Sequence, residues 1–202
     1  MRTYEHELPA SYREVKSIDA TKPAVGLVFN LLSILPFFVL VPLFLSRYTY
    51  RDVIASPWRL AAIGLLLIGM VAYILLHELT HGLAYKCLTG QKLTFGLSWS
   101  CAFCGVPGIY CYRRTMLIAV TAPFVVFSLV LIPLFIVAML TDAAFAMATG
   151  ILLGLHLGGC SGDLYVTLLL LFVYRDERLL MRDTGPKQTF YLPCDESTTE
   201  QA

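Results

Sequence analysis

Four long apolar stretches limit what this chain can fold into. They cover roughly residues 24–45, 60–85, 116–140 and 145–174, and all fifteen lysines and arginines fall outside them. A helix needs about 20 apolar residues to cross a bilayer, so each stretch is long enough. With 57% hydrophobic and only 14% charged residues, the composition is typical of an integral membrane protein. A net charge of +1 argues against a nucleic-acid partner.

The basic residues indicate on which side of the membrane the connections lie. With both termini in the cytosol, most basic residues lie inside, as the positive-inside rule requires. The inside set is Arg2, Arg13, Lys16, Lys22, Lys86, Lys92, Arg113, Arg114, Arg175, Arg178, Arg182 and Lys187, and the outside set is Arg47, Arg51 and Arg59. We therefore predict a multi-pass protein of the cell membrane with cytosolic N and C termini.

The predicted fold class is an all-α integral membrane protein with four transmembrane helices and a short β-hairpin between helices 2 and 3. Residues 1–23 form a cytosolic arm, residues 24–174 the membrane domain with the hairpin at about 88–115, and residues 175–202 a cytosolic tail. Three spans with one re-entrant segment are the alternative. Pro36 and Pro42 predict a kink in the first helix.

Few ionisable side chains lie inside the apolar stretches, and they indicate a candidate site. Glu78 and Asp163 are the only acids there, and His77, His81 and His156 join them. Such a side chain in the centre of a bilayer costs roughly 2.5–3.5 kcal/mol on insertion scales, so it usually has a function. Five of them on two helices indicate one site, although a polar cluster that only holds helices together is the alternative.

Residues 77–81 read His-Glu-Leu-Thr-His, which is the H-E-x-x-H motif. Histidines four residues apart share one face of a helix, so His77 and His81 can bind the same zinc ion. The carboxylate of Glu78 is then placed to take a proton from a water molecule, as a general base does. The alternative is a group of polar residues at a helix end near the lipid headgroups.

A hydrolytic zinc site needs a third protein ligand, and Asp163 and His156 are the candidates. At 1.5 Å per residue, Asp163 lies about 18 Å from the cytosolic end of the last stretch and His156 about 28 Å. Because the depth of Asp163 is close to that of the histidine pair, we predict Asp163 as the ligand. Three glycines within residues 158–162 weaken the helix and allow close approach of the backbone.

The segment 88–115 is unusually apolar for a cytosolic loop. Apolar and small or polar residues alternate over residues 92–103, residues 105–108 read as a turn, and residues 109–113 read as a shorter strand. We predict a hairpin beside the metal helix, whose edge binds an extended substrate by β-augmentation. A hairpin that only plugs the site is the alternative. Cys101, Cys104 and Cys111 are expected to be packing residues, with a second metal site as the minor alternative.

The chain resembles a family of small four-helix membrane proteins described as zincin peptidases, and more distantly it is similar to the site-2 proteases, which cut helices within membranes. The resemblance rests on His77-Glu78-x-x-His81, the apolar hairpin and Gly162-Asp163-Leu164, with Leu8-Pro9-x-x-Tyr12 in the arm and Asp183-Thr184-Gly185 to Phe190-Tyr191 in the tail. Site-2 proteases usually carry their aspartate in a Leu-Asp-Gly context, from which this chain departs. The resemblance implies a membrane zinc site and hydrolysis of a peptide bond.

These observations predict a zinc-dependent membrane-embedded peptidase. His77, His81 and Asp163 hold Zn²⁺, and Glu78 is the catalytic base. The expected substrate is a membrane protein or peptide, cut in a membrane-bound or membrane-adjacent segment, and the lipid bilayer is the other partner. Two alternatives remain: a non-catalytic scaffold with a structural zinc site, and a hydrolase of a lipid-soluble amide.

Overall fold

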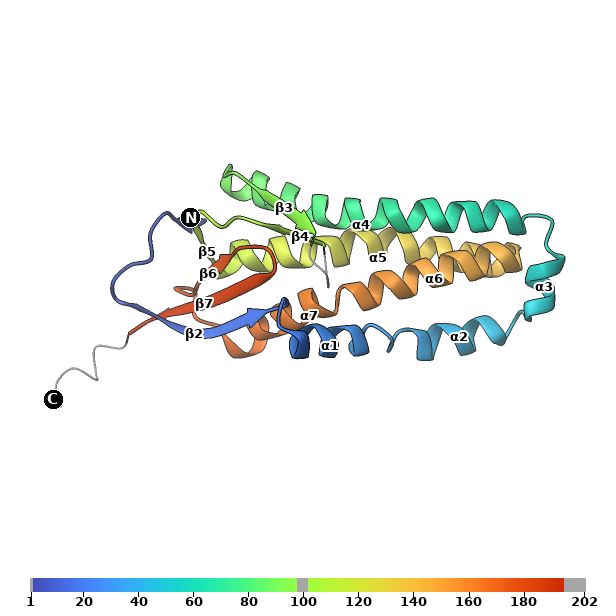
Figure 1. Cartoon of the computed structure of the whole chain (residues 1–202), viewed down its shortest axis with the longest axis horizontal. Helices are drawn as coiled ribbons and strands as arrows, with labels where there is room; N and C mark the ends of the chain where they lie inside the picture. Colours follow the sequence, from blue (N-terminus) through green and yellow to red (C-terminus); the bar gives the residue numbers. More distant parts are fainter. Residues whose placement is uncertain (1, 98–101, 195–202) are drawn as a thin grey trace. The chain divides into compact units, whose positions relative to one another are not determined.

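The computed structural model describes residues 2–97 and 102–194 (Figure 1). The chain divides into two compact units. The first comprises Met1–Gly26, Glu78–Val120 and Val166–Ala202, and the second comprises Leu27–His77 and Thr121–Tyr165. Four helices contribute residues to both units: α1 (Pro23–Leu32), α4 (Arg59–Thr89), α5 (Arg113–Thr141) and α7 (Ser161–Leu168). The predicted division into arm, membrane domain and tail follows different boundaries and stays a prediction.

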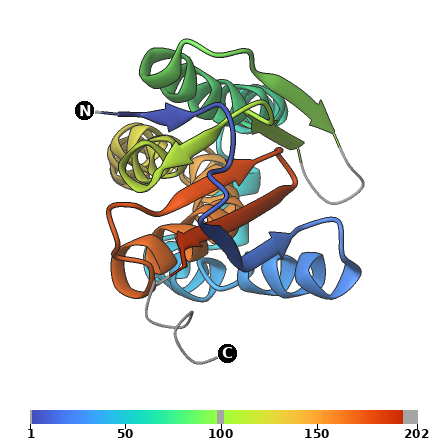
Figure 2. The same ribbon diagram turned by 90° about the vertical axis from the view of Figure 1, so that its left-hand side faces the viewer.

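The first unit contains a five-stranded antiparallel sheet, so the predicted all-α fold is wrong. Its strand order is β1-β5-β6-β7-β2. The strands are β1 (Tyr4–Glu5), β2 (Tyr12–Asp19), β5 (Tyr110–Tyr112), β6 (Leu180–Asp183) and β7 (Lys187–Pro193). Figure 2 shows the strands from the two ends of the chain, blue and red, side by side. The arm and the tail, which we expected to be extensions, therefore supply four of the five strands.

Hydrogen-bonded pairing of β2 with β7 joins the two ends of the chain within the sheet. β2 pairs with β7 from Tyr12 opposite Pro193 to Asp19 opposite Lys187, with an irregularity between Glu14 and Lys16. One face of the sheet lies on a core of fully buried side chains. They include Val106, Ile109, Leu179, Met181 and Phe190, packed together with Tyr85 of α4 and Met116 of α5. Burial of this apolar surface, at about 25 cal/mol per Å², is the main stabilising contribution to the unit.

A separate hairpin is present between α4 and α5, but its strands differ from those predicted. β3 (Thr94–Leu97) pairs antiparallel with β4 (Ala102–Gly105), and Phe95 lies opposite Cys104. The predicted strand over 92–103 is thus two strands, and the connection at 98–101 falls outside the described residues. The predicted second strand is β5, which belongs to the larger sheet.

Two of the three cysteines near the hairpin lie in described strands. Cys101 lies outside the described residues. Cys104 of β4 and Cys111 of β5 are buried, and burial raises the pKa of each thiol to about 12. Metal ligation requires the thiolate, and within the described ranges neither residue belongs to a group of potential metal ligands. Both side chains lie among the buried core residues, and their expected role in packing stays a prediction.

Among the described residues, three helices are long and apolar enough to cross a membrane: Pro23–Leu45, α4 and α5. The first is broken into α1 (Pro23–Leu32) and α2 (Phe37–Leu45), next to Pro36 as predicted, and the short α3 (Tyr50–Ala55) follows. The last apolar stretch is a pair of segments bent by 41°: α6 (Ala143–Gly159), then α7, which continues as a π-helix over Leu169–Val173. The predicted set of four plain spans is therefore wrong. The described part of the chain has three candidate spans, or up to four if the bent pair counts as one span.

Small residues let the helices of the second unit approach closely. A Cβ atom at Gly154 would lie 2.5 Å from the Phe37 ring, and one at Gly158 would collide with the backbone carbonyl of Ser33. Asp142 begins α6 by accepting hydrogen bonds from the backbone N–H groups of Ala144 and Phe145. This packing holds α2 and the connection at Ser33 against α6.

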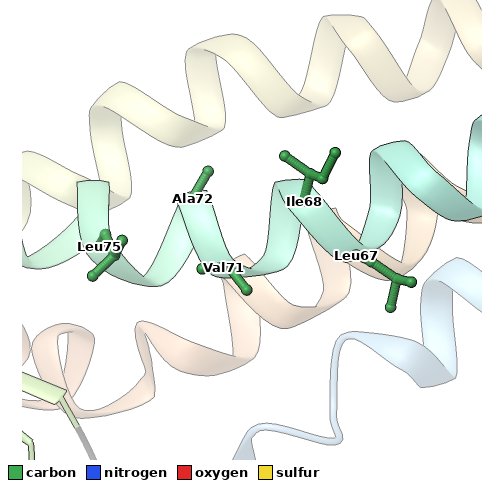
Figure 3. Close-up of a pocket in the computed structure, with 5 residues that line it drawn as sticks. All are labelled: Leu67, Ile68, Val71, Ala72 and Leu75. Atoms are coloured by element: carbon green, nitrogen blue, oxygen red, sulfur yellow. The ribbon is translucent and has the colours of Figure 1, made fainter.

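The outer face of α4 is apolar. Figure 3 shows a surface pocket on this helix whose five labelled side chains are all hydrocarbon: Leu67, Ile68, Val71, Ala72 and Leu75. The four larger ones are more than half exposed. Large apolar patches of this kind are rare on soluble monomers and are typical of contact with lipid or a partner. They are consistent with association of this unit with a membrane.

Candidate metal centre

The H-E-x-x-H motif lies within α4, two turns before the helix ends at Thr89. His77 and His81 are both buried, each with 8% of its surface exposed. Glu78 is partly buried. Because the helix is continuous through all five residues of the motif, the two imidazoles stand on one face, one turn apart.

Asp163 lies in the first turn of α7. The glycine-rich run ends α6 at Gly159, Cys160 is the C-cap, and the helix restarts at Ser161 after the bend. Asp163 Oδ2 lies 3.3 Å from His77 Nε2. His77, His81 and Asp163 each offer one ligand atom, and these three atoms lie within 4.8 Å of one another. Two imidazole nitrogens and one carboxylate are a ligand set that zinc accepts in hydrolases.

Local acceptors orient both imidazoles. The Nδ1 of His81 lies 2.9 Å from the backbone oxygen of Ala119. A carbonyl only accepts, so this nitrogen carries the proton and Nε2 keeps its lone pair. The Nδ1 of His77 lies 3.0 Å from the hydroxyl of Tyr73, and its Nε2 faces Asp163. A second partner that fixes the ring in this way is the usual arrangement for metal-binding histidines.

His156 lies in the polar network on the other side of His77. It is completely buried, with Nδ1 3.2 Å from the Tyr73 hydroxyl and Nε2 3.0 Å from Ser128 Oγ. His77, His156 and Cys160 form a second group whose ligand atoms lie within 4.8 Å of one another. The depth argument separated His156 from the zinc pair by two turns, yet one tyrosine hydroxyl connects it to His77.

Sequence reasoning overlooked Tyr73 and Ser128. Tyr73 is four residues before His77, so both stand on the same face of α4, which is a spacing that the sequence displays. Ser128 gives no such signal, because a hydroxyl in an apolar helix usually bonds its own backbone. Its role depends on packing between α5 and α6.

The hairpin lies next to the motif. A Cβ atom at Gly82 would be 2.7 Å from the Phe95 ring of β3, so the absence of a side chain there allows the hairpin to pack on α4 one turn beyond Glu78. Burial raises the pKa of Cys104 in β4, and the nearby Glu78 carboxylate raises it further. Both observations place the strands beside the predicted catalytic carboxylate.

Comparison with known proteins gives one family. A family model described as "Putative zincin peptidase" matches residues 70–177, which is more than half of the chain. The matched range includes Tyr73, the whole H-E-x-x-H motif, the hairpin and Asp163. No curated protein and no solved structure matches the chain.

Proposed function

Because this chain belongs to the zincin peptidase family, we propose that it is a membrane-embedded zinc peptidase that hydrolyses a peptide bond in a membrane-bound or membrane-adjacent segment. The observation that carries the proposal is the meeting of His77 and Asp163, from two helices, beside the second histidine of the motif. Three protein ligands would leave one position of a zinc ion for water or substrate, as in catalytic zinc sites.

Each residue then has a role. His77, His81 and Asp163 hold the metal. A zinc ion bound there would activate a water molecule and polarise the scissile carbonyl. Glu78 accepts the proton of the attacking water and passes it to the nitrogen of the leaving amine as the C–N bond breaks. The carboxylate needs no metal contact for this role, because three other side chains serve as ligands.

The exposed strand of the hairpin supports an extended peptide substrate. In the described part of the chain, β3 pairs only with β4, so its other edge offers backbone groups to a further strand. Phe95 and Leu97 of β3 are 50% and 82% exposed, and both suit an apolar segment. This strand is beside Glu78, where a bound peptide would meet the carboxylate.

The substitution Glu78→Gln tests the proposal. It keeps the size of the side chain but removes the base, so turnover of a membrane-embedded reporter peptide should fall about 10²–10⁴-fold. Zinc should stay at about one per chain, measured by metal analysis of purified protein, because the ligands are intact. His77→Ala is the matched control, and it should lose both metal and activity.

A scaffold with a structural zinc predicts a different result. Wild-type protein and the Glu78→Gln variant would then bind zinc equally and both leave every reporter uncut. Cleavage by the variant at the wild-type rate would contradict the role of Glu78 as the base.

A further inference from the structure

A chain of hydrogen-bonding groups runs through the second unit behind His77. The Tyr73 hydroxyl lies 3.0 Å from His77 Nδ1 and 3.2 Å from His156 Nδ1. The other ring nitrogen of His156, Nε2, lies 3.0 Å from Ser128 Oγ. Four side chains from α4, α5 and α6 are thus connected in series, from the candidate metal ligand to a serine.

The surroundings hold these groups in place. Tyr73 meets Phe127 edge to face, with ring centroids 5.2 Å apart. Phe124 stacks on the imidazole of His156, with centroids 6.0 Å apart and ring planes at 26°. Aromatic contacts of this kind restrict ring rotation. In an apolar setting an unprotonated, neutral imidazole is favoured, with one nitrogen as donor and the other as acceptor.

Only one assignment of protons suits a metal on His77. An imidazole that gives Nε2 to a metal carries its proton on Nδ1, which then donates to the Tyr73 oxygen. The Tyr73 O–H donates onward to His156 Nδ1, and the Nε2–H of His156 donates to Ser128 Oγ. Each donor has an acceptor at 3.0–3.2 Å.

We propose that Tyr73 and His156 are positioning residues, which fix the tautomer and the ring orientation of His77 so that Nε2 faces the metal. This inference rests on the proposed zinc site. His81 receives the same support from the Ala119 carbonyl, so the two imidazoles of the motif have different kinds of partner.

The same residues also suggest a second metal bound by His77, His156 and Cys160. The hydroxyl of Tyr73 argues against it. This oxygen lies within hydrogen-bond distance of both imidazoles, so it occupies the space between the two Nδ1 atoms that such a metal would need. The Cys160 sulfur is 3.6 Å from His156 Nδ1, whose single lone pair accepts from the Tyr73 hydroxyl in the assignment above.

The variant Tyr73→Phe tests the proposal on the full-length protein. It removes one oxygen and keeps the ring contacts. Zinc affinity, measured by competition with a chromophoric chelator, should fall roughly 10–100-fold, the usual effect of losing such a partner. Tyr48→Phe is the matched control, because the Tyr48 hydroxyl donates to the Met139 carbonyl in the same unit, 3.1 Å away. It should leave zinc affinity unchanged.

A second measurement separates positioning from general stability. Thermal unfolding of the metal-free variants should show similar losses for Tyr73→Phe and Tyr48→Phe, while only the former weakens zinc binding. His156→Gln should weaken it as well. Equal zinc affinity in Tyr73→Phe and wild type would overturn the proposal and leave the zinc site standing.

Two further outcomes have distinct meanings. If wild-type protein binds no zinc, the proposed function fails first, and the positioning role fails with it. If wild type binds a second zinc equivalent that Cys160→Ser abolishes, His156 and Cys160 are themselves ligands, and the positioning role is overturned while the first site remains.

Discussion

At the scale of single residues, this chain places several polar groups where they meet a specific partner rather than water. Asp183 of β6 is an example outside the membrane-spanning segments. It is buried and accepts hydrogen bonds from the Tyr85 hydroxyl at 2.6 Å and from the backbone N–H of Gly185 at 2.8 Å. Burial still dominates, and it raises the pKa of this carboxyl to about 6.

The raised pKa of Asp183 makes stability depend on pH. The folded state retains this proton at pH values where the unfolded chain, with a pKa near 3.8, has lost it. The stabilisation is therefore full below about pH 4 and is lost as pH rises through about 6. Asp183→Asn should remove a contribution on the order of 3 kcal/mol to this dependence. Thermal unfolding in detergent between pH 4 and 8 measures it, and parallel curves for both proteins would contradict the assignment.

At the scale of elements, small residues decide where the helices meet. Gly158→Ala should destabilise the protein by about 1–3 kcal/mol, because the added methyl group collides with the Ser33 backbone, which moves less easily than a side chain. Gly64→Ala is the control. It also lies within a helix but has open space around it, so it should stabilise by up to about 1 kcal/mol. Thermal unfolding of both variants checks the prediction, and equal effects would contradict it.

The sequence predicts the helices better than the strands. The apolar stretches and the kink near Pro36 are visible because hydropathy and proline act locally. β2 is not visible, because its burial does not alternate cleanly and an irregularity interrupts its pairing. Its partner β7 lies about 170 residues further along the chain, and no local sequence pattern predicts that two such distant strands pair. Likewise, Glu78 and Asp163 can be recognised in the sequence as charges in apolar helices. The role of Ser128 cannot, because it depends on the contact with His156 of a neighbouring helix.

At the scale of the whole chain, the five-stranded sheet bears on topology. It joins residues of the arm, of the segment between α4 and α5, and of the tail. Strands that share hydrogen bonds lie in one compartment, so in the proposed membrane-embedded protein we expect these three segments on one side of the membrane. The excess of basic residues in the same segments predicts that this is the cytosolic side.

Cysteine labelling tests this orientation. Cys194 follows β7 and is exposed, so a membrane-impermeant thiol reagent should modify it only from the cytosolic side. Cys87 is exposed as well, so the matched control is Arg51→Cys in a Cys87→Ser, Cys194→Ser background. Arg51 is exposed in α3, and the introduced cysteine should react only from outside. The reverse pattern would invert the orientation.

The pairing of β2 with β7 also has a consequence for synthesis. The first strands leave the ribosome well before their partners, since β1 and β2 end by Asp19 and β6 begins only at Leu180. Until then Val106 and Ile109 lack the apolar cover of Met181 and Phe190. A chain truncated before residue 180 cannot close the sheet and presents these surfaces to chaperones and proteases. Closure of the sheet therefore has to wait until translation has passed β7.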